Sequence, residues 1–155
     1  KILKEVVNQQ PTKIKETFDK NDQKEFLKGA KIAYETIITD FSDNDNKITN
    51  SRSLLNKEIY NQFNEALKER NARGHHAEIT FIGINSAEIK EHKKVDKMLN
   101  VTVDFIAEVI TCIKDKDKKI VSGDPEKIKK IYDTWIFSRD ITSMNPNWQL
   151  VNILT

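Results

Sequence analysis

The chain has 155 residues, and its 26 Lys and Arg residues nearly balance its 24 Asp and Glu residues, for a formal net charge of +2. This charge is too small to identify a partner, and the length is typical of one domain. The four glycines and three prolines exclude collagen-like and low-complexity chains. The single cysteine, Cys112, excludes a disulfide framework within the chain and a cysteine-rich metal site.

The first half of the chain is predicted to be helical. Residues 1–10 place apolar side chains on one face of a short helix that Pro11 ends, and residues 1–24 are expected to form an N-terminal helix and linker. Residues 25–41 repeat apolar residues every 3.6 positions, which predicts a long amphipathic helix.

A second long helix is predicted over residues 57–73, after a short helical segment at residues 50–55. Asn56 is a suitable N-cap because its side chain can accept a hydrogen bond from the first turn. Gly74 is the expected C-terminal glycine, since glycine readily adopts the left-handed conformation found there.

After Gly74 the apolar residues recur with a period of two, which predicts strands. The expected strands cover residues 77–91, 95–109, 127–140 and 148–154, joined by turns at residues 92–94, 114–119, 122–125 and 143–147. Helices followed by strands favour an α+β fold with an antiparallel sheet. We therefore expect a domain over residues 25–155 in which the N-terminal helices pack on a strongly curved four-stranded antiparallel sheet.

Two motifs close to the C-terminus carry a family resemblance. The first is W-x-F-x-R-D at residues 135–140, and the second is N-P-N-W-x-L at residues 145–150. Residues 25–30 (EFLKGA), the Leu54-Leu55 helix entry and the spacing of Arg70 and Gly74 fit the same pattern. Over about residues 25–154 the chain resembles the C-terminal domain family of the forty-four-kilodalton membrane-tethering subunit of the mitochondrial inner-membrane import translocase, including its bacterial relatives.

The resemblance implies a cone-shaped α+β fold similar to nuclear transport factor two. It also implies a link to the inner membrane, to acidic phospholipid surfaces and to translocating chains. The lysine- and asparagine-rich composition favours a bacterial relative. We therefore expect a soluble domain at the bacterial inner membrane, bound peripherally or anchored by a segment that precedes Lys1.

A curled sheet that helices fill incompletely is expected to leave a binding pocket at the mouth of the cone. The candidate lining residues are apolar and face the predicted core: Phe26, Ala30, Tyr34, Ile37, Phe81, Phe105, Trp135, Phe137 and Trp148. The alternative is that these side chains simply fill the core, as most aromatic residues on strands do. Arg139 shares a face with Trp135 and Phe137, so it either binds an anion or has a structural role.

Exposed lysines in the predicted hairpins are candidates for a basic rim that approaches a membrane or a partner: Lys93, Lys94, Lys116, Lys118 and Lys119. Each lysine close to an anionic surface contributes about 1 kcal/mol of attraction. The alternative is that these lysines are solvated and protect strand edges from aggregation.

Enzymatic and metal chemistry find little support in the sequence. The adjacent His75 and His76 cannot both aim at one ion from a strand, so we expect neither a metal nor a cofactor. No P-loop, dinucleotide fingerprint or nucleophile elbow is present, and no catalytic residue is assigned. Asp133 shares a face with Trp135 and is the single carboxylate to check for a role in catalysis, with Tyr34 as a hydroxyl partner. Asp104 is expected to point away from the apolar face of its strand.

The sequence thus predicts a non-catalytic binding module of a membrane-associated protein-transport or envelope-assembly component. Its apolar cavity and basic rim would receive a chain, a lipid or a partner protein, with weak binding to anionic lipid and none to nucleic acid. The alternatives are a soluble ribosome- or protein-interaction module of the same fold and a small-molecule isomerase or lyase.

Overall fold

Over residues 17–42 and 48–155, which the computed structural model describes, the chain forms an α+β fold with two long helices and a five-stranded antiparallel sheet. The helix predicted over residues 1–10 lies outside the described residues. The elements are α2 (Lys20–Asp40), the 3-10 helix η1 (Arg52–Leu54), α3 (Lys57–Ala72), β1 (His76–Val95), β2 (Met98–Lys114), β3 (Ile120–Gly123), β4 (Lys129–Asp140) and β5 (Gln149–Ile153).

Helix α2 begins five residues before the predicted start at residue 25. Its N-terminus is a capping box, in which the Asp19 carboxylate accepts from the Asp22 backbone N–H and the Asp22 carboxylate accepts from the Asp19 backbone N–H. This reciprocal pair satisfies two amide donors at the helix start, so the first turn forms before the apolar repeat begins.

Helix α3 confirms the predicted helix and both of its ends. The Asn56 side chain accepts a hydrogen bond from the Ile59 backbone N–H at 2.8 Å. At the other end Gly74 has a φ of +70°, and the amides of Gly74 and His75 donate to the carbonyls of Asn71 and Arg70. These two bonds form a Schellman motif, which turns the chain out of the helix toward β1.

The sheet has the order β1-β2-β4-β5, and β3 pairs with β2 beyond the end of β4. The prediction of four strands is therefore wrong. The additional strand, β3, begins directly after the predicted turn at residues 114–119. It includes Ser122 and Gly123, so the turn predicted at residues 122–125 begins two residues too early, and all four residues of β3 are exposed. An exposed strand this short has no alternation of apolar and polar residues that would reveal it in the sequence.

The turn predicted at residues 92–94 is also wrong, because β1 continues to Val95. Lys93 and Lys94 pair with Asn100 and Leu99 of β2, and Val95 pairs with Met98. Only two residues, 96 and 97, remain for the hairpin turn, and Asp96 has a φ of +55°. A two-residue hairpin turn favours residues such as Asp that tolerate positive φ.

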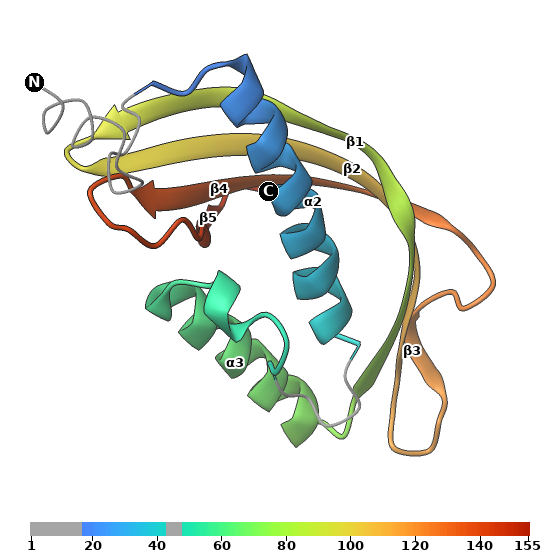
Figure 1. Cartoon of the computed structure of the whole chain (residues 1–155). Helices are drawn as coiled ribbons and strands as arrows, with labels where there is room; N and C mark the ends of the chain where they lie inside the picture. Colours follow the sequence, from blue (N-terminus) through green and yellow to red (C-terminus); the bar gives the residue numbers. More distant parts are fainter. Residues whose placement is uncertain (1–16, 43–47) are drawn as a thin grey trace, which may run out of the picture.

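The sheet is strongly bent and remains open. Figure 1 shows β1 and β2 following one curved path together, with α2 on the concave side and α3 beyond it. The register between β1 and β2 shifts at three places, between residues 81 and 83, 84 and 86, and 89 and 91. Such bulges bend a strand and increase its twist, which accounts for the curvature.

The core lies between the concave face of the sheet and α2. On β2 the predicted alternation is confirmed, since Val101, Val103, Phe105 and Ala107 are all buried. Tyr34 of α2 is completely buried, and its ring stacks on that of Phe105 with a centroid distance of 4.2 Å. In the described part of the chain, no helix has the length and apolar character needed to cross a membrane.

Candidate functional site

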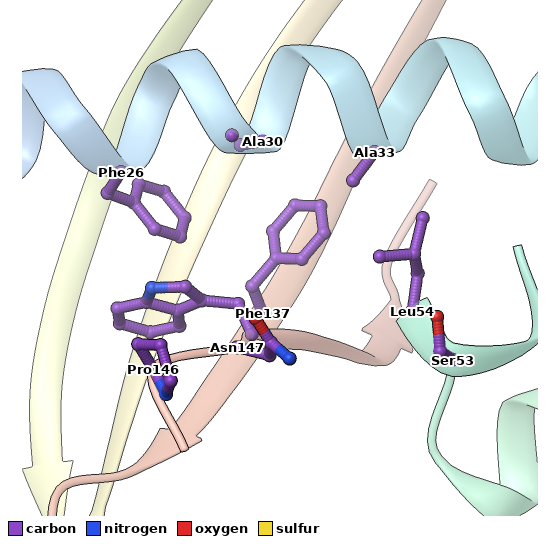
Figure 2. Close-up of a pocket in the computed structure, with 10 residues that line it drawn as sticks. Phe26, Ala30, Ala33, Ser53, Leu54, Phe137, Pro146 and Asn147 are labelled. Atoms are coloured by element: carbon purple, nitrogen blue, oxygen red, sulfur yellow. The ribbon is translucent and has the colours of Figure 1, made fainter. Parts of the chain in front are cut away.

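An apolar pocket of about 390 Å³ opens between α2, η1 and the loop that joins β4 to β5. Its walls are formed mainly by apolar side chains and one glycine: Phe26, Gly29, Ala30, Ala33, Ser53, Leu54, Phe137, Pro146, Asn147 and Trp148. Figure 2 shows Phe26 and Ala30 on α2 above Phe137 of the sheet, with Leu54 facing the same space from η1. A volume of this size falls in the range of small ligand sites.

The pocket exists because α2 carries small side chains at this level. Gly29, Ala30 and Ala33 leave the space unfilled, and a Cβ built on Gly29 would meet no atom within 4 Å. Further along the same helix, Tyr34 fills the equivalent space against Phe105 and Trp135. The change from small to large residues along α2 therefore sets where the core ends and the pocket begins.

The loop between β4 and β5 forms the opposite wall and is held by local hydrogen bonds. The Ser143 hydroxyl accepts from the Asn145 backbone N–H, and the Asn145 side chain accepts from the Asn147 backbone N–H. These consecutive turns place Pro146 and Trp148 at the pocket, with the Trp148 ring 4.6 Å from that of Phe26. The turn role predicted for residues 145–147 is thus confirmed.

A polar pocket of about 380 Å³ adjoins the apolar one. The two pockets are neighbours because Ser53 and Asn147 line both. The remaining lining residues of the polar pocket lie on β4, on the loop after it and at the start of β2 and β5: Met98, Ser138, Arg139, Asp140, Ser143, Asn145 and Gln149. Hydroxyl, amide and guanidinium groups therefore gather next to an apolar cavity.

Arg139 is the cationic side chain in the wall of the polar pocket. Its Nε is buried and has no hydrogen-bond partner in the described part of the chain. The neighbouring Asp140 does not neutralise it, because its carboxylate accepts from the Thr142 backbone N–H and hydroxyl and lies 3.8 Å from Lys97 Nζ. The hydrogen bonds from Thr142, together with the charge of Lys97, lower the pKa of Asp140 below its usual value.

Tyr34 and Asp133 form the hydroxyl–carboxylate pair that the sequence suggested, with the Tyr34 hydroxyl donating to the Asp133 carboxylate. Burial raises the pKa of Asp133, and the hydrogen bond from Tyr34 opposes part of this rise. Burial and then the bond to Asp133 raise the pKa of Tyr34 far above its usual value. Neither residue lines the apolar or the polar pocket. Asp104 faces the other side of the sheet, where it accepts from the Thr134 hydroxyl.

The structure divides the nine predicted pocket residues into two groups. Four of them line the apolar pocket: Phe26, Ala30, Phe137 and Trp148. The other five fill the core or pack against it: Tyr34, Ile37, Phe81, Phe105 and Trp135. The prediction missed the small residues Gly29 and Ala33, although the G-A-x-x-A spacing on the predicted helix was a usable signal.

The five predicted rim lysines are all exposed, but they do not lie at one end of the sheet. Lys93 and Lys94 lie beside the β1–β2 turn, whereas Lys116, Lys118 and Lys119 lie at the turn between β2 and β3. Strand β2 separates these turns (Figure 1). Its 17 residues, at about 3.3 Å each, correspond to about 55 Å along the strand. The lysines therefore form two separate basic tips.

Metal binding finds no support in residues 17–42 and 48–155, where no cluster of three or more His, Cys, Asp or Glu side chains could hold an ion. His92 instead contacts Phe18, with ring centroids 5.0 Å apart.

Comparison with known proteins identifies the family. The profile described as the Tim44-like domain matches residues 7–155. The chain is 27% identical over 105 residues to the probable mitochondrial import inner membrane translocase subunit tin-44 of Caenorhabditis elegans. The aligned region covers 66% of this chain and 25% of that protein. It is 25% identical over 96 residues to the mitochondrial import inner membrane translocase subunit TIM44 of Mus musculus, covering 61% of this chain and 21% of that protein.

The chain thus spans about a quarter or less of the length of these relatives. Among solved structures, the intermembrane space region of the chloroplast protein ARC6 is similar at 12% identity and a TM-score of 0.41, over 81% of this chain and 96% of that one. The family profile covers nearly the whole sequence, including both C-terminal motifs and the residues that line the two pockets. The chain belongs to the Tim44-like domain family.

Proposed function

We propose that this domain is a non-catalytic binding module of a membrane-associated protein-transport component. It takes an apolar polypeptide segment into the pocket between α2, η1 and the β4–β5 loop. The observation that carries the proposal is the apolar pocket itself, which the small residues of α2 leave open in a domain of the Tim44-like family. The names of the relatives, which are import translocase subunits, supply the transport context.

The chemistry of the pocket suits an apolar side chain. Phe26, Phe137 and Trp148 provide aromatic surface, and Leu54 and Pro146 provide aliphatic surface. Burying apolar area in such a site is favourable by about 25 cal/mol per Å². Ser53 and Asn147 at the border with the polar pocket can pair with a peptide backbone, because their side chains both donate and accept hydrogen bonds.

The setting that we propose is a bacterial inner membrane, with a transport or envelope-assembly complex as the protein partner. The two basic tips would contribute weak attraction to anionic lipid, and a soluble ribosome- or protein-interaction role of the same fold is the alternative. The bent open sheet with α2 on its concave side supports the cone similar to nuclear transport factor two. An isomerase or lyase role has less support, because Asp133 and Tyr34 lie outside both pockets.

The test enlarges Gly29, a residue that lines the pocket and has no side chain, so that the pocket becomes smaller. Gly29→Leu places an apolar side chain in open space without removing any core residue, and Gly29→Ala is the matched control at the same position. Binding of the blocked hexapeptide acetyl-SGLFLA-amide is measured by calorimetry and by tryptophan fluorescence, because Trp148 lines the pocket. We expect Gly29→Leu to weaken binding about tenfold or more and Gly29→Ala to change it less than about threefold, since a methyl group removes little volume.

Two results would contradict the proposal. One is that the wild-type chain does not bind the peptide at millimolar concentration. The other is that Gly29→Leu binds as tightly as the wild type while remaining folded by circular dichroism. Sedimentation with vesicles, with and without anionic lipid, separately measures the contribution of the basic tips.

A further inference from the structure

The polar pocket has features that the apolar segment alone does not explain. Arg139 contributes a positive charge to the residues that line this pocket. Its guanidinium Nε is buried and has no hydrogen-bond partner among the described residues. Buried donors in proteins are nearly always paired, so an unpaired guanidinium nitrogen in a residue that lines a cavity is compatible with an acceptor supplied from outside the chain. The nearest carboxylate in sequence, Asp140, is already engaged by Thr142 and Lys97.

Resting on the proposed function, we infer that the polar pocket binds the C-terminal carboxylate of a polypeptide, whose last apolar side chain occupies the apolar pocket. Arg139 is the residue that recognises the carboxylate. A guanidinium matches a carboxylate with two parallel hydrogen bonds, which gives both strength and orientation. Ser143, which also lines the pocket, supplies a further hydroxyl donor.

Contact between the two pockets favours a chain terminus. Ser53 and Asn147 line both, so the anionic and apolar groups of the ligand must be close together. At a C-terminus the carboxylate is attached to the same Cα as the last side chain, without a flexible stem between them. An acidic side chain within a chain would instead require the backbone to pass through the site.

Amide side chains around Arg139 favour a peptide over a lipid headgroup. Asn145, Asn147 and Gln149 each carry a donor and an acceptor, which matches the N–H and C=O groups of a peptide backbone. The Asn145 amide oxygen already accepts from the Asn147 backbone N–H. The phosphodiester of a lipid offers acceptors alone and would leave the amide oxygens of Asn147 and Gln149 without donors.

The experiment compares two peptides that differ only at the C-terminus. Acetyl-SGLFAL with a free carboxylate and acetyl-SGLFAL-amide, which both end in leucine so that the last side chain can occupy the apolar pocket, are titrated into the full chain by calorimetry. We expect the free acid to bind about tenfold more tightly or better, since hydrogen bonds to charged groups are the stronger class. Arg139→Gln should abolish this preference, and Arg139→Lys, which keeps the charge and loses the paired geometry, should retain part of it.

The matched control is Arg73→Gln, which removes the same charge from an exposed position at the end of α3. It should leave the preference for the acid unchanged. Circular dichroism and thermal unfolding of each variant verify the fold. Because Arg139→Lys conserves the long aliphatic stem, it remains informative if Arg139→Gln does not fold.

Failure of this inference differs from failure of the proposed function. Equal binding of acid and amide, both weakened by Gly29→Leu, would overturn the carboxylate site and leave the apolar site standing. No binding of either peptide would overturn both. Arg139-dependent binding of acetyl-SGLFLE-amide without any preference for the free acid would assign Arg139 to an internal acidic side chain. Arg139-dependent binding of phosphatidylglycerol vesicles, again without that preference, would assign it to a lipid headgroup.

Discussion

Replacing Tyr34 with Phe tests how α2 is fixed to the sheet. The substitution removes a single hydroxyl and keeps the ring that stacks on Phe105 at 4.2 Å and contacts Trp135 at 4.6 Å. The Asp133 carboxylate then loses its hydrogen-bond donor in a half-buried position. Hydrogen bonds to charged groups contribute about 1.5–3 kcal/mol. Because Asp133 retains partial access to water, we expect a loss of about 1–2 kcal/mol at pH 7.

The cost of Tyr34→Phe should depend on pH with a definite sign. Burial raises the pKa of Asp133 in the folded state, above an unfolded value of about 3.9. A raised folded pKa means that the stability contributed by protonated Asp133 is complete below about pH 3.9 and is lost as the pH rises through the folded pKa. The Tyr34 hydroxyl lowers the folded-state pKa of Asp133, so removing it raises this pKa further. More folding stability is then lost as the pH rises, and Tyr34→Phe should therefore cost more at pH 7 than at pH 3.5.

Urea unfolding at a series of pH values between 3.5 and 8, followed by tryptophan fluorescence, measures these free energies. Asp133→Asn cannot ionise, so its stability relative to the wild type should rise with pH. Asp104→Asn is the matched control, because it makes the same change on the opposite face, where Asp104 accepts from Thr134 at 2.7 Å. The reasoning is refuted if Tyr34→Phe costs the same free energy at both ends of the pH range.

Three further substitutions test local features of the fold. Gly123→Ala should remove the hydrogen-exchange protection of the β3 amides, because Gly123 has a φ of +81° and an added Cβ would lie 2.4 Å from the Thr111 carbonyl oxygen. Asp40→Ala should lower the free energy of unfolding in urea by about 2 kcal/mol or more, since the buried Ser51 N–H and hydroxyl lose their acceptor. Asn56→Ala should lower it by about 1 kcal/mol through loss of the N-cap of α3, and an unchanged urea midpoint would contradict the capping role.

The helices and the long strands could be predicted because their patterns record burial directly. On β2, residues 101–109 alternate between the core and the opposite face, and a period of two is typical of a strand with one buried face. The missed start of α2 had a signal of its own, since Asp19 and Asp22 have the spacing of a capping box. Apolar periodicity does not reveal this start, because the first turn of a solvated helix needs no apolar residues.

The errors in the sheet come from exposed residues. Lys93 and Lys94 have the polar character of a turn, yet the hydrogen bonds to β2 continue through them because an exposed strand tolerates charge. Strand β3 is held by pairing with residues 112–114 of β2, a partner that cannot be identified from four exposed residues. In both places tertiary pairing overrides the local composition.

The division between core and pocket depends on two elements at once, which is why the nine candidate residues could not be separated by sequence. Trp135, Phe137 and Arg139 follow one another on the same face of β4, and nothing in that row distinguishes a core residue from a pocket residue. The distinction comes from α2, where Tyr34 covers Trp135 while Gly29 and Ala30 leave the space by Phe137 open.

Because some residues line the pocket without belonging to the core, substitutions can test peptide binding and folding stability separately. Phe137 serves both the core and the pocket, so its truncation to alanine should cost about 3–5 kcal/mol of stability and would leave any loss of binding ambiguous. A Cβ added at Gly29 would lie in open space. Alanine is also favoured over glycine in a helix by about 1 kcal/mol. Enlarging this residue therefore changes the pocket while the core and the helix remain intact, so a loss of binding there reports on the pocket alone.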